Sequence, residues 1–144
     1  MDLDEVAFPA LVVADDGWVQ QFGSKEELST WTYSAVAKYG KRDVVLYDCR
    51  DCAWRVGNIA PLNHENKVTD LFAGSCNRKI LVRITVRPIT EGPLQAAQKA
   101  LVTAIDANDD ILTQFTEAAD LKNAVGMAQS FKTLISALKD KRVI

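Results

Sequence analysis

The residues of this sequence that are best suited to chemistry are three cysteines and one histidine. Their spacing, C-x2-C-x11-H-x11-C, is formed by Cys49, Cys52, His64 and Cys76, and such a set could hold a tetrahedral zinc ion. Zinc modules usually supply a second close ligand pair, whereas eleven residues separate His64 from Cys76. The odd number of cysteines does not fit a closed set of disulfides either. We therefore expect no cofactor, and a zinc-stabilised adaptor remains an alternative.

The same side chains could also serve a small enzyme. The thiol of Cys76 and the imidazole of His64 would form a nucleophile and its base if the fold brought them together. The sequence contains no glycine-rich phosphate loop, no G-x-S-x-G and no H-E-x-x-H. The adjacent carboxylates Asp15–Asp16 and Asp109–Asp110 are typical of turns and helix caps rather than of an acid/base pair. We expect no catalytic site, and an enzyme that uses Cys76 and His64 is the second alternative.

Cys49 and Cys52 also fit a purely structural interpretation, because they flank a candidate turn between two strands. A two-residue loop at Arg50–Asp51 would place Cys49 opposite Cys52. The same register would place Tyr47 opposite Trp54, on the same face of the hairpin. An aromatic pair of this kind is first of all a packing device, so the motif predicts a hairpin.

Strand patterns occupy most of the first ninety residues. The predicted elements are strands at 6–13 and 18–22, a helix over 24–39, a hairpin over 43–59, an ambiguous stretch at 60–77 and a strand at 79–87. Asp16-Gly17 separates the first two strands, and Ser24 with Glu27 forms a capping box for the helix. Tight turns between consecutive strands imply antiparallel pairing. We predict an antiparallel sheet of about five strands, ββαββ(α)β, with helices mainly on one face.

The last third of the chain shows helical periodicity. Leu94, Ala97, Leu101 and Ala104 form one apolar stripe after Gly92-Pro93. A final helix is predicted over about 120–139, so strands followed by helices indicate the α+β class. The 144 residues correspond to a single domain, 1–144, with a sheet-forming part at 1–91 and a helical part at 92–144 packed on it.

Composition and charge exclude several classes of protein. Hydrophobic residues make up 48% of the chain and charged residues 25%, which is typical of a globular domain rather than a disordered one. No apolar stretch is long enough to span a membrane, and the first 15 residues carry acids without a base, unlike a secretory signal. The formal net charge of −2 argues against a nucleic-acid binder. We expect a cytoplasmic protein with neither a nucleic-acid nor a membrane partner.

Charged side chains are grouped by sign along the chain. Residues 78–87 contain four basic residues and no acid, whereas residues 106–120 contain five acids and no base. Such sectors occur on ordinary solvated surfaces, and they also suit a macromolecular partner that is steered by complementary charge. Because no catalytic constellation emerges, we interpret the chain as a binding module. The candidate contact residues are Asp15, Asp16, Arg50, Asp51, Arg55, Arg83, Arg87, Asp106, Asp109 and Asp110.

The first part of the chain combines a strand, a tight turn, a helix and an aromatic hairpin over about residues 6–60. These features are marked by Phe8-Pro9, Asp16-Gly17, Trp18, Ser24, Tyr47 and Trp54. Their order resembles that of small stand-alone bacterial immunity proteins, which are encoded beside polymorphic toxins of contact-dependent or type VI secretion. The resemblance implies a cytoplasmic, non-enzymatic protein that binds a cognate toxin domain and occludes its active site. It carries over no functional residue, and it leaves the toxin's chemistry and the oligomeric state open.

Overall fold

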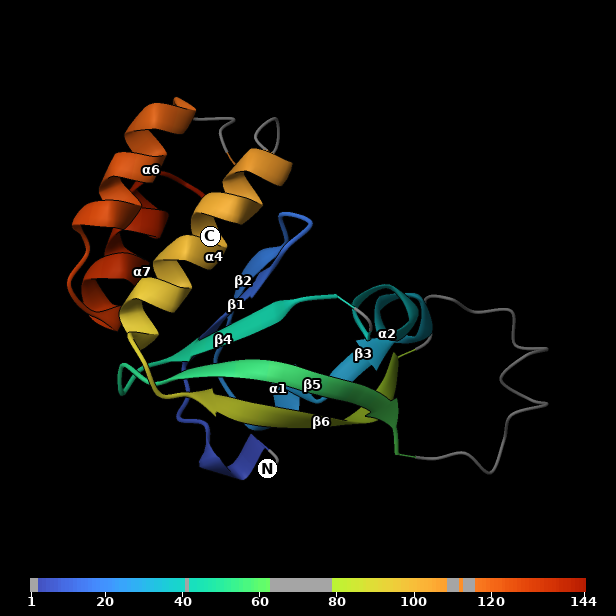
Figure 1. The fold of residues 1–144 in the computed structure, drawn as a ribbon. Helices are drawn as coiled ribbons and strands as arrows, with labels where there is room; N and C mark the ends of the chain where they lie inside the picture. Colours follow the sequence, from blue (N-terminus) through green and yellow to red (C-terminus); the bar gives the residue numbers. More distant parts are fainter. Residues whose placement is uncertain (1–2, 41, 63–78, 109–111, 113–115) are drawn as a thin grey trace.

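The described part of the chain folds into a curled antiparallel sheet followed by three helices (Figure 1), which confirms the predicted α+β class. The computed structural model describes residues 3–40, 42–62, 79–108, 112 and 116–144. Within these residues the strands are β1 (Ala10–Ala14), β2 (Val19–Phe22), β3 (Thr30–Thr32), β4 (Val44–Asp48), β5 (Ala53–Pro61) and β6 (Lys79–Ile89). They pair in the order β2-β1-β4-β5-β6-β3, and all of these pairings are antiparallel.

The sixth strand comes from a segment that the sequence pattern assigned to one continuous helix. The capping residue Ser24 does open a helix, but α1 (Lys25–Leu28) has a single turn, and Thr30–Thr32 forms β3 beside β6. Thr32 then caps α2 (Tyr33–Tyr39) by accepting the N–H of Ala35 at 3.2 Å. Threonines on both sides of Trp31 favour extended backbone, and pairing with β6 rewards it. The predicted helix over 24–39 is therefore wrong in its middle.

The hairpin between β4 and β5 is shifted by one residue from the predicted register. Tyr47 lies opposite Ala53 and Leu46 lies opposite Trp54, so Tyr47 and Trp54 face opposite sides of the sheet. The loop has three residues instead of two, because the N–H of Asp48 bonds the carbonyl of Cys52 at 2.8 Å. Asp51 completes the loop in the left-handed region with φ 62°, which aspartate tolerates.

The central strands β1 and β4 are buried on both faces of the sheet. Successive residues of β1 therefore enter different cores, since Leu11 faces the C-terminal helices and Val12 faces the opposite side. The helix-side core is shared with α4 (Pro93–Ala107), α6 (Ala118–Met127) and α7 (Phe131–Asp140). The core on the other side includes side chains of η1 (Leu3–Glu5), α1 and α2. The predicted helical layer on one face is confirmed.

The C-terminal helices are joined to one another as well as to the sheet. Ala97 and Leu101 of α4 are fully buried, as their periodicity predicted. Gln98, on the same helix, donates through Nε2 to the carbonyls of Val125 (2.9 Å) and Ala128 (3.0 Å) at the end of α6. These bonds satisfy carbonyls that a helix end leaves without an intrahelical partner. The helical layer is thus a connected unit over β1 and β4.

Some predictions fall outside the described residues. These are the ambiguous stretch at 60–77 beyond Leu62, the side chains of His64 and Cys76, and the carboxylates Asp109 and Asp110. In the parts of the chain that the structure does describe, no helix combines the length and the apolar character needed to cross a membrane.

Candidate interaction surface

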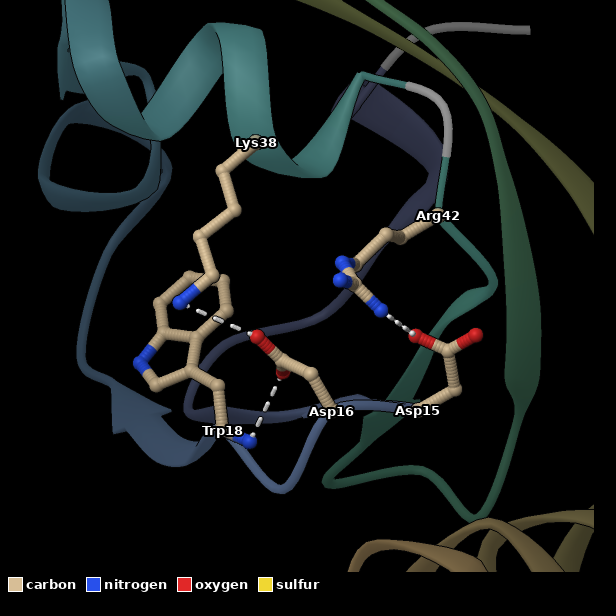
Figure 2. A network of polar contacts seen from close by, with 5 residues as sticks. All are labelled: Asp15, Asp16, Trp18, Lys38 and Arg42. Atoms are coloured by element: carbon tan, nitrogen blue, oxygen red, sulfur yellow. Dashed lines mark hydrogen bonds and ion pairs between the residues drawn. The ribbon is translucent and has the colours of Figure 1, made fainter. Parts of the chain in front are cut away.

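The two carboxylates of the β1–β2 turn are held by cations of the same chain (Figure 2). Asp15 Oδ1 lies 3.4 Å from Arg42 Nη1, and Asp16 Oδ2 lies 3.2 Å from Lys38 Nζ. The backbone N–H of Trp18 donates to Asp16 Oδ1 at 3.2 Å. Burial alone would raise the pKa of Asp16, but the N–H of Trp18 and the ammonium of Lys38 stabilise its carboxylate and lower the pKa. Both aspartates thus fasten the turn to α2 and the segment that follows it.

An aromatic cluster beneath this turn keeps it in place. The ring of Trp18 lies 4.6 Å from that of Tyr39, 5.4 Å from that of Trp31 and 6.1 Å from that of Phe22, measured between centroids. Trp31 and Phe22 are buried, whereas Trp18 is only partly so. The Trp18 ring meets Phe22 and Trp31 edge-to-face and Tyr39 at a tilt of 33°, and such packing adds to the stabilisation from burial of the rings. The predicted contact residues Asp15 and Asp16 therefore stand on a rigid turn.

Asp48 is the charged residue that the sequence did not single out, and it organises the second hairpin. Its side chain is fully buried and accepts four N–H groups at 2.9–3.2 Å. Oδ1 accepts from the backbone of Arg50 and Cys52, and Oδ2 accepts from the backbone of Ala7 and the indole of Trp54. An aspartate at the end of a buried strand commonly accepts the N–H groups of the following turn. Its position in the sequence could therefore have predicted this role for Asp48.

The tip of the same hairpin contacts the helical layer and the N-terminal turn. Asp51 Oδ1 accepts the hydroxyl of Tyr47 at 2.8 Å and the backbone N–H of Phe131 at 2.6 Å, at the start of α7. Burial and the bond to Asp51 raise the pKa of Tyr47, so its hydroxyl stays a donor. Arg50 donates to the carbonyl of Glu5 at 2.9 Å. These two predicted contact residues are exposed, yet both already join separate parts of the fold.

A cleft of about 310 Å³ between α4 and the sheet brings two distant predicted residues together. Asp15 and Arg55 both line it, together with Asp43 and Lys99. Arg55 forms an ion pair with Asp43 at the rim, so the charges of the cleft are mixed. Asp106 lies outside this cleft, where it pairs with Lys122 of α6. No single acidic patch forms from the described aspartates.

The outer face of β6 differs from this cleft, because among the described residues no acid neutralises its arginines. The core on the side away from the C-terminal helices contains Val82, Ile84 and Val86 of β6. Arg83 and Arg87 alternate with them along the strand and are exposed. Neither arginine has an ion-pair partner among the residues that the structure describes. The helical layer lies over β1, β4 and the start of β5, away from β6 (Figure 1). This open face, with Arg55, Arg83 and Arg87, is the basic sheet face.

The register of β5 and β6 places two members of the basic sheet face side by side. Arg55 lies directly opposite Arg87, and Ala60 lies opposite Arg83. Like charges at opposite positions of an antiparallel pair destabilise the sheet. Asp43 compensates Arg55, but within the described residues nothing compensates Arg87. Of this cross-strand pair, Arg87 is therefore the arginine whose charge is left open to a partner.

The cysteine motif gives no assembled metal centre in the part of the chain that is described. Cys49 and Cys52 are free and exposed, and their sulfur atoms lie near the carbonyls of Phe8 and Arg50. No group of three or more histidine, cysteine, aspartate or glutamate side chains suited to a metal occurs among the described residues. His64 and Cys76 are not among them, so the four-residue set stays a prediction.

Comparison with protein-family models, curated proteins and solved structures found no significant match. The function of the chain is therefore inferred from the geometry of the described surface and from the resemblance that its sequence carries.

Proposed function

We propose that this chain is a non-enzymatic immunity protein that binds a cognate antibacterial toxin domain in the cytoplasm and occludes it. The observation that supports this proposal is the basic sheet face. An open strand surface that is backed by the buried core of Val82, Ile84 and Val86 is held in place, so a partner can bind it with little loss of conformational entropy. Steric occlusion requires such a surface and no catalytic group.

The charges of the basic sheet face define the chemistry of the partner. Arg83 and Arg87 are exposed and unpaired within the described residues, and Arg87 faces Arg55 across the strands. An acidic partner would pair with these arginines and would be steered towards the face by long-range attraction. Arginine is also enriched at the energetic centres of protein interfaces. We assign the main contact to Arg83 and Arg87.

The predicted acidic contacts have a different place in this proposal. Asp15, Asp16, Asp51 and Asp106 each accept a hydrogen bond or an ion pair from their own chain. A partner would have to displace these internal contacts before it could use the carboxylates. They stay predictions as partner contacts, and we place them at the margin of the interface rather than at its centre.

The test uses the C-terminal domain of a secreted protein encoded beside this chain as the candidate toxin. Wild-type protein should protect bacteria that express this domain and should bind it in a calorimetric titration. The double variant Arg83→Glu with Arg87→Glu should lower the affinity by about 100-fold, because two attractive contacts become repulsive. Its melting temperature should not fall, since the exchanged side chains are exposed.

A matched control reverses two exposed lysines of α7. Lys132→Glu with Lys139→Glu changes the net charge by the same amount, on a helix remote from β6 (Figure 1). This variant should bind and protect like the wild type. Failure of the wild-type protein to bind or protect would refute the proposal. About one zinc per purified chain would favour the adaptor, and an activity abolished by thiol alkylation would favour the enzyme.

A further inference from the structure

Two large apolar side chains lie next to each other on the basic sheet face. Leu81 of β6 is 61% exposed, and Leu62, just after β5, is 52% exposed. The N–H of Leu62 bonds the carbonyl of Leu81 at 3.0 Å, so the two residues occupy opposite positions where β5 pairs with β6. Among the described residues the only other large hydrophobic side chain of this kind is Met127, at the end of α6. The exposed apolar surface is thus concentrated at one place.

Basic and hydroxyl groups surround this leucine pair. Lys79 and Arg83 flank Leu81 on the same face of β6, and Thr30 of β3 lies opposite Leu81. The strand positions around the pair carry no acid. An apolar centre with a charged rim is the usual anatomy of a protein interface. It differs from the simple alternation of a solvated face, where Leu81 would be polar.

A groove of about 220 Å³ adjoins the pair. Its lining includes Leu62 and Arg83 together with Leu3, Lys25 and Ser29. The groove is apolar at Leu62 and Leu3, Arg83 lines it as well, and Lys25 is ion-paired with Asp4. A side chain that enters it would therefore meet hydrophobic contact and positive charge at once.

We propose that the Leu62–Leu81 pair is the anchor point of the interface, where an apolar side chain flanked by carboxylates on the partner protein docks. This inference rests on the proposed function and specifies the contact that the toxin domain makes. Charge complementarity argues for an acidic protein, because the rim formed by Lys79 and Arg83 is wholly basic. A second copy of this chain would instead bring basic rims against each other.

Nucleic acid is a less fitting occupant of the same face. Sheet surfaces that bind single strands present aromatic rings on which bases stack. Here Trp31 and Trp54, on β3 and β5, are both buried on the opposite face of the sheet. A duplex would need phosphate contacts alone, and two leucines at the centre would interrupt them.

The test exchanges each exposed hydrophobic residue for glutamine. Leu81→Gln and Leu62→Gln should each lower the affinity for the toxin domain by about 30-fold, the loss typical of an interface hot spot. Met127→Gln is the matched control, since Met127 is 71% exposed on α6, and it should bind like the wild type. Melting temperatures show whether each variant is folded. Leu81→Thr, which introduces a β-branched side chain suited to a strand, replaces Leu81→Gln if the latter melts early.

The outcomes separate this inference from the function on which it rests. If the wild type binds and the leucine variants bind equally well, the anchor is wrong and the proposed function stands. If the wild type does not bind the toxin domain, both fall together. Binding of a labelled RNA or DNA oligonucleotide that is lost in Leu81→Gln would replace the protein partner by nucleic acid. A homodimer in light scattering that dissociates in Leu81→Gln would identify the face as a self-interface.

Discussion

Asp48 shows how one carboxylate determines the local structure of a hairpin. All four groups that it accepts are N–H donors, so an acceptor-only side chain matches the site fully. An amide at this position would keep one oxygen acceptor and turn its NH₂ group towards two donors. Buried polar groups that lose their partners cost more than the bonds themselves contribute.

Asp48→Asn should therefore lower the free energy of unfolding by about 2–4 kcal/mol. Chemical denaturation monitored by tryptophan fluorescence measures this directly, since Trp54 is one of the four donors. Asp106→Asn is the control, because within the described residues this exposed carboxylate pairs only with Lys122, and the stability of the variant should be nearly unchanged. Equal stability of the two variants would contradict the structural role assigned to Asp48.

The register of the hairpin between β4 and β5 could not be predicted from the sequence. The hairpin over 43–59 was predicted, but its register was not, because loops of two and of three residues are built from the same turn-forming residue types. Asp51 adopts φ 62°, and Asp48 binds two N–H groups of the same loop. Neither preference can be read from residue types alone, since Asp occurs in both kinds of turn.

At the element scale, the sequence predicted helices and strands correctly where a single periodicity was present. It was wrong where helix and strand preferences occurred in the same segment. The alternation of β6 and the stripe of α4 follow a single period, and the structure confirms both. The segment from Ser24 to Tyr39 has capping and helical signals on both sides of Thr30–Thr32. A strand forms there because Thr30–Thr32 pairs with the start of β6, which lies far away in the sequence.

The connection between the β1–β2 turn and α2 gives a prediction for pH dependence. The pKa of Asp16 is lowered in the folded protein, so the folded state binds its proton less readily than the unfolded state. Its stabilising contribution is therefore present above about pH 4 and is lost as the pH falls through the folded value. Unfolding curves of the wild type and Asp16→Asn should differ at pH 6 and converge towards pH 3.

The partner of Asp16 supplies the control for this experiment. Lys38 contributes to the lowered pKa of Asp16, together with the N–H of Trp18. In a Lys38→Gln background, the part of the difference that depends on pH should shrink and not vanish. A difference between wild type and Asp16→Asn that stays constant from pH 6 to pH 3 would contradict the argument.

At the scale of the whole molecule, the class of the fold followed from the sequence, while the surface did not. Periodicity identifies which residues are buried, but it does not say which exposed charges find partners. Asp15 and Arg42 are 27 residues apart, and their contact depends on how β1, α2 and β4 are arranged. The sequence did not predict the leucine pair for the same reason, because Leu62 and Leu81 are brought opposite each other only when β5 pairs with β6.

The two-sided burial of the central strands predicts that neither part of the chain folds alone. A fragment of residues 1–91 would expose Leu11, Val13 and Tyr47, which are almost fully buried beneath the helices. Each such side chain contributes about 1.5–3 kcal/mol, against a total stability of about 5–15 kcal/mol for a typical domain. The fragment should therefore show no cooperative thermal transition and should bind a hydrophobic dye. The full chain should unfold in one transition, and a cooperative transition in the fragment would show two domains instead of one, since the sheet would then stand without its helical layer.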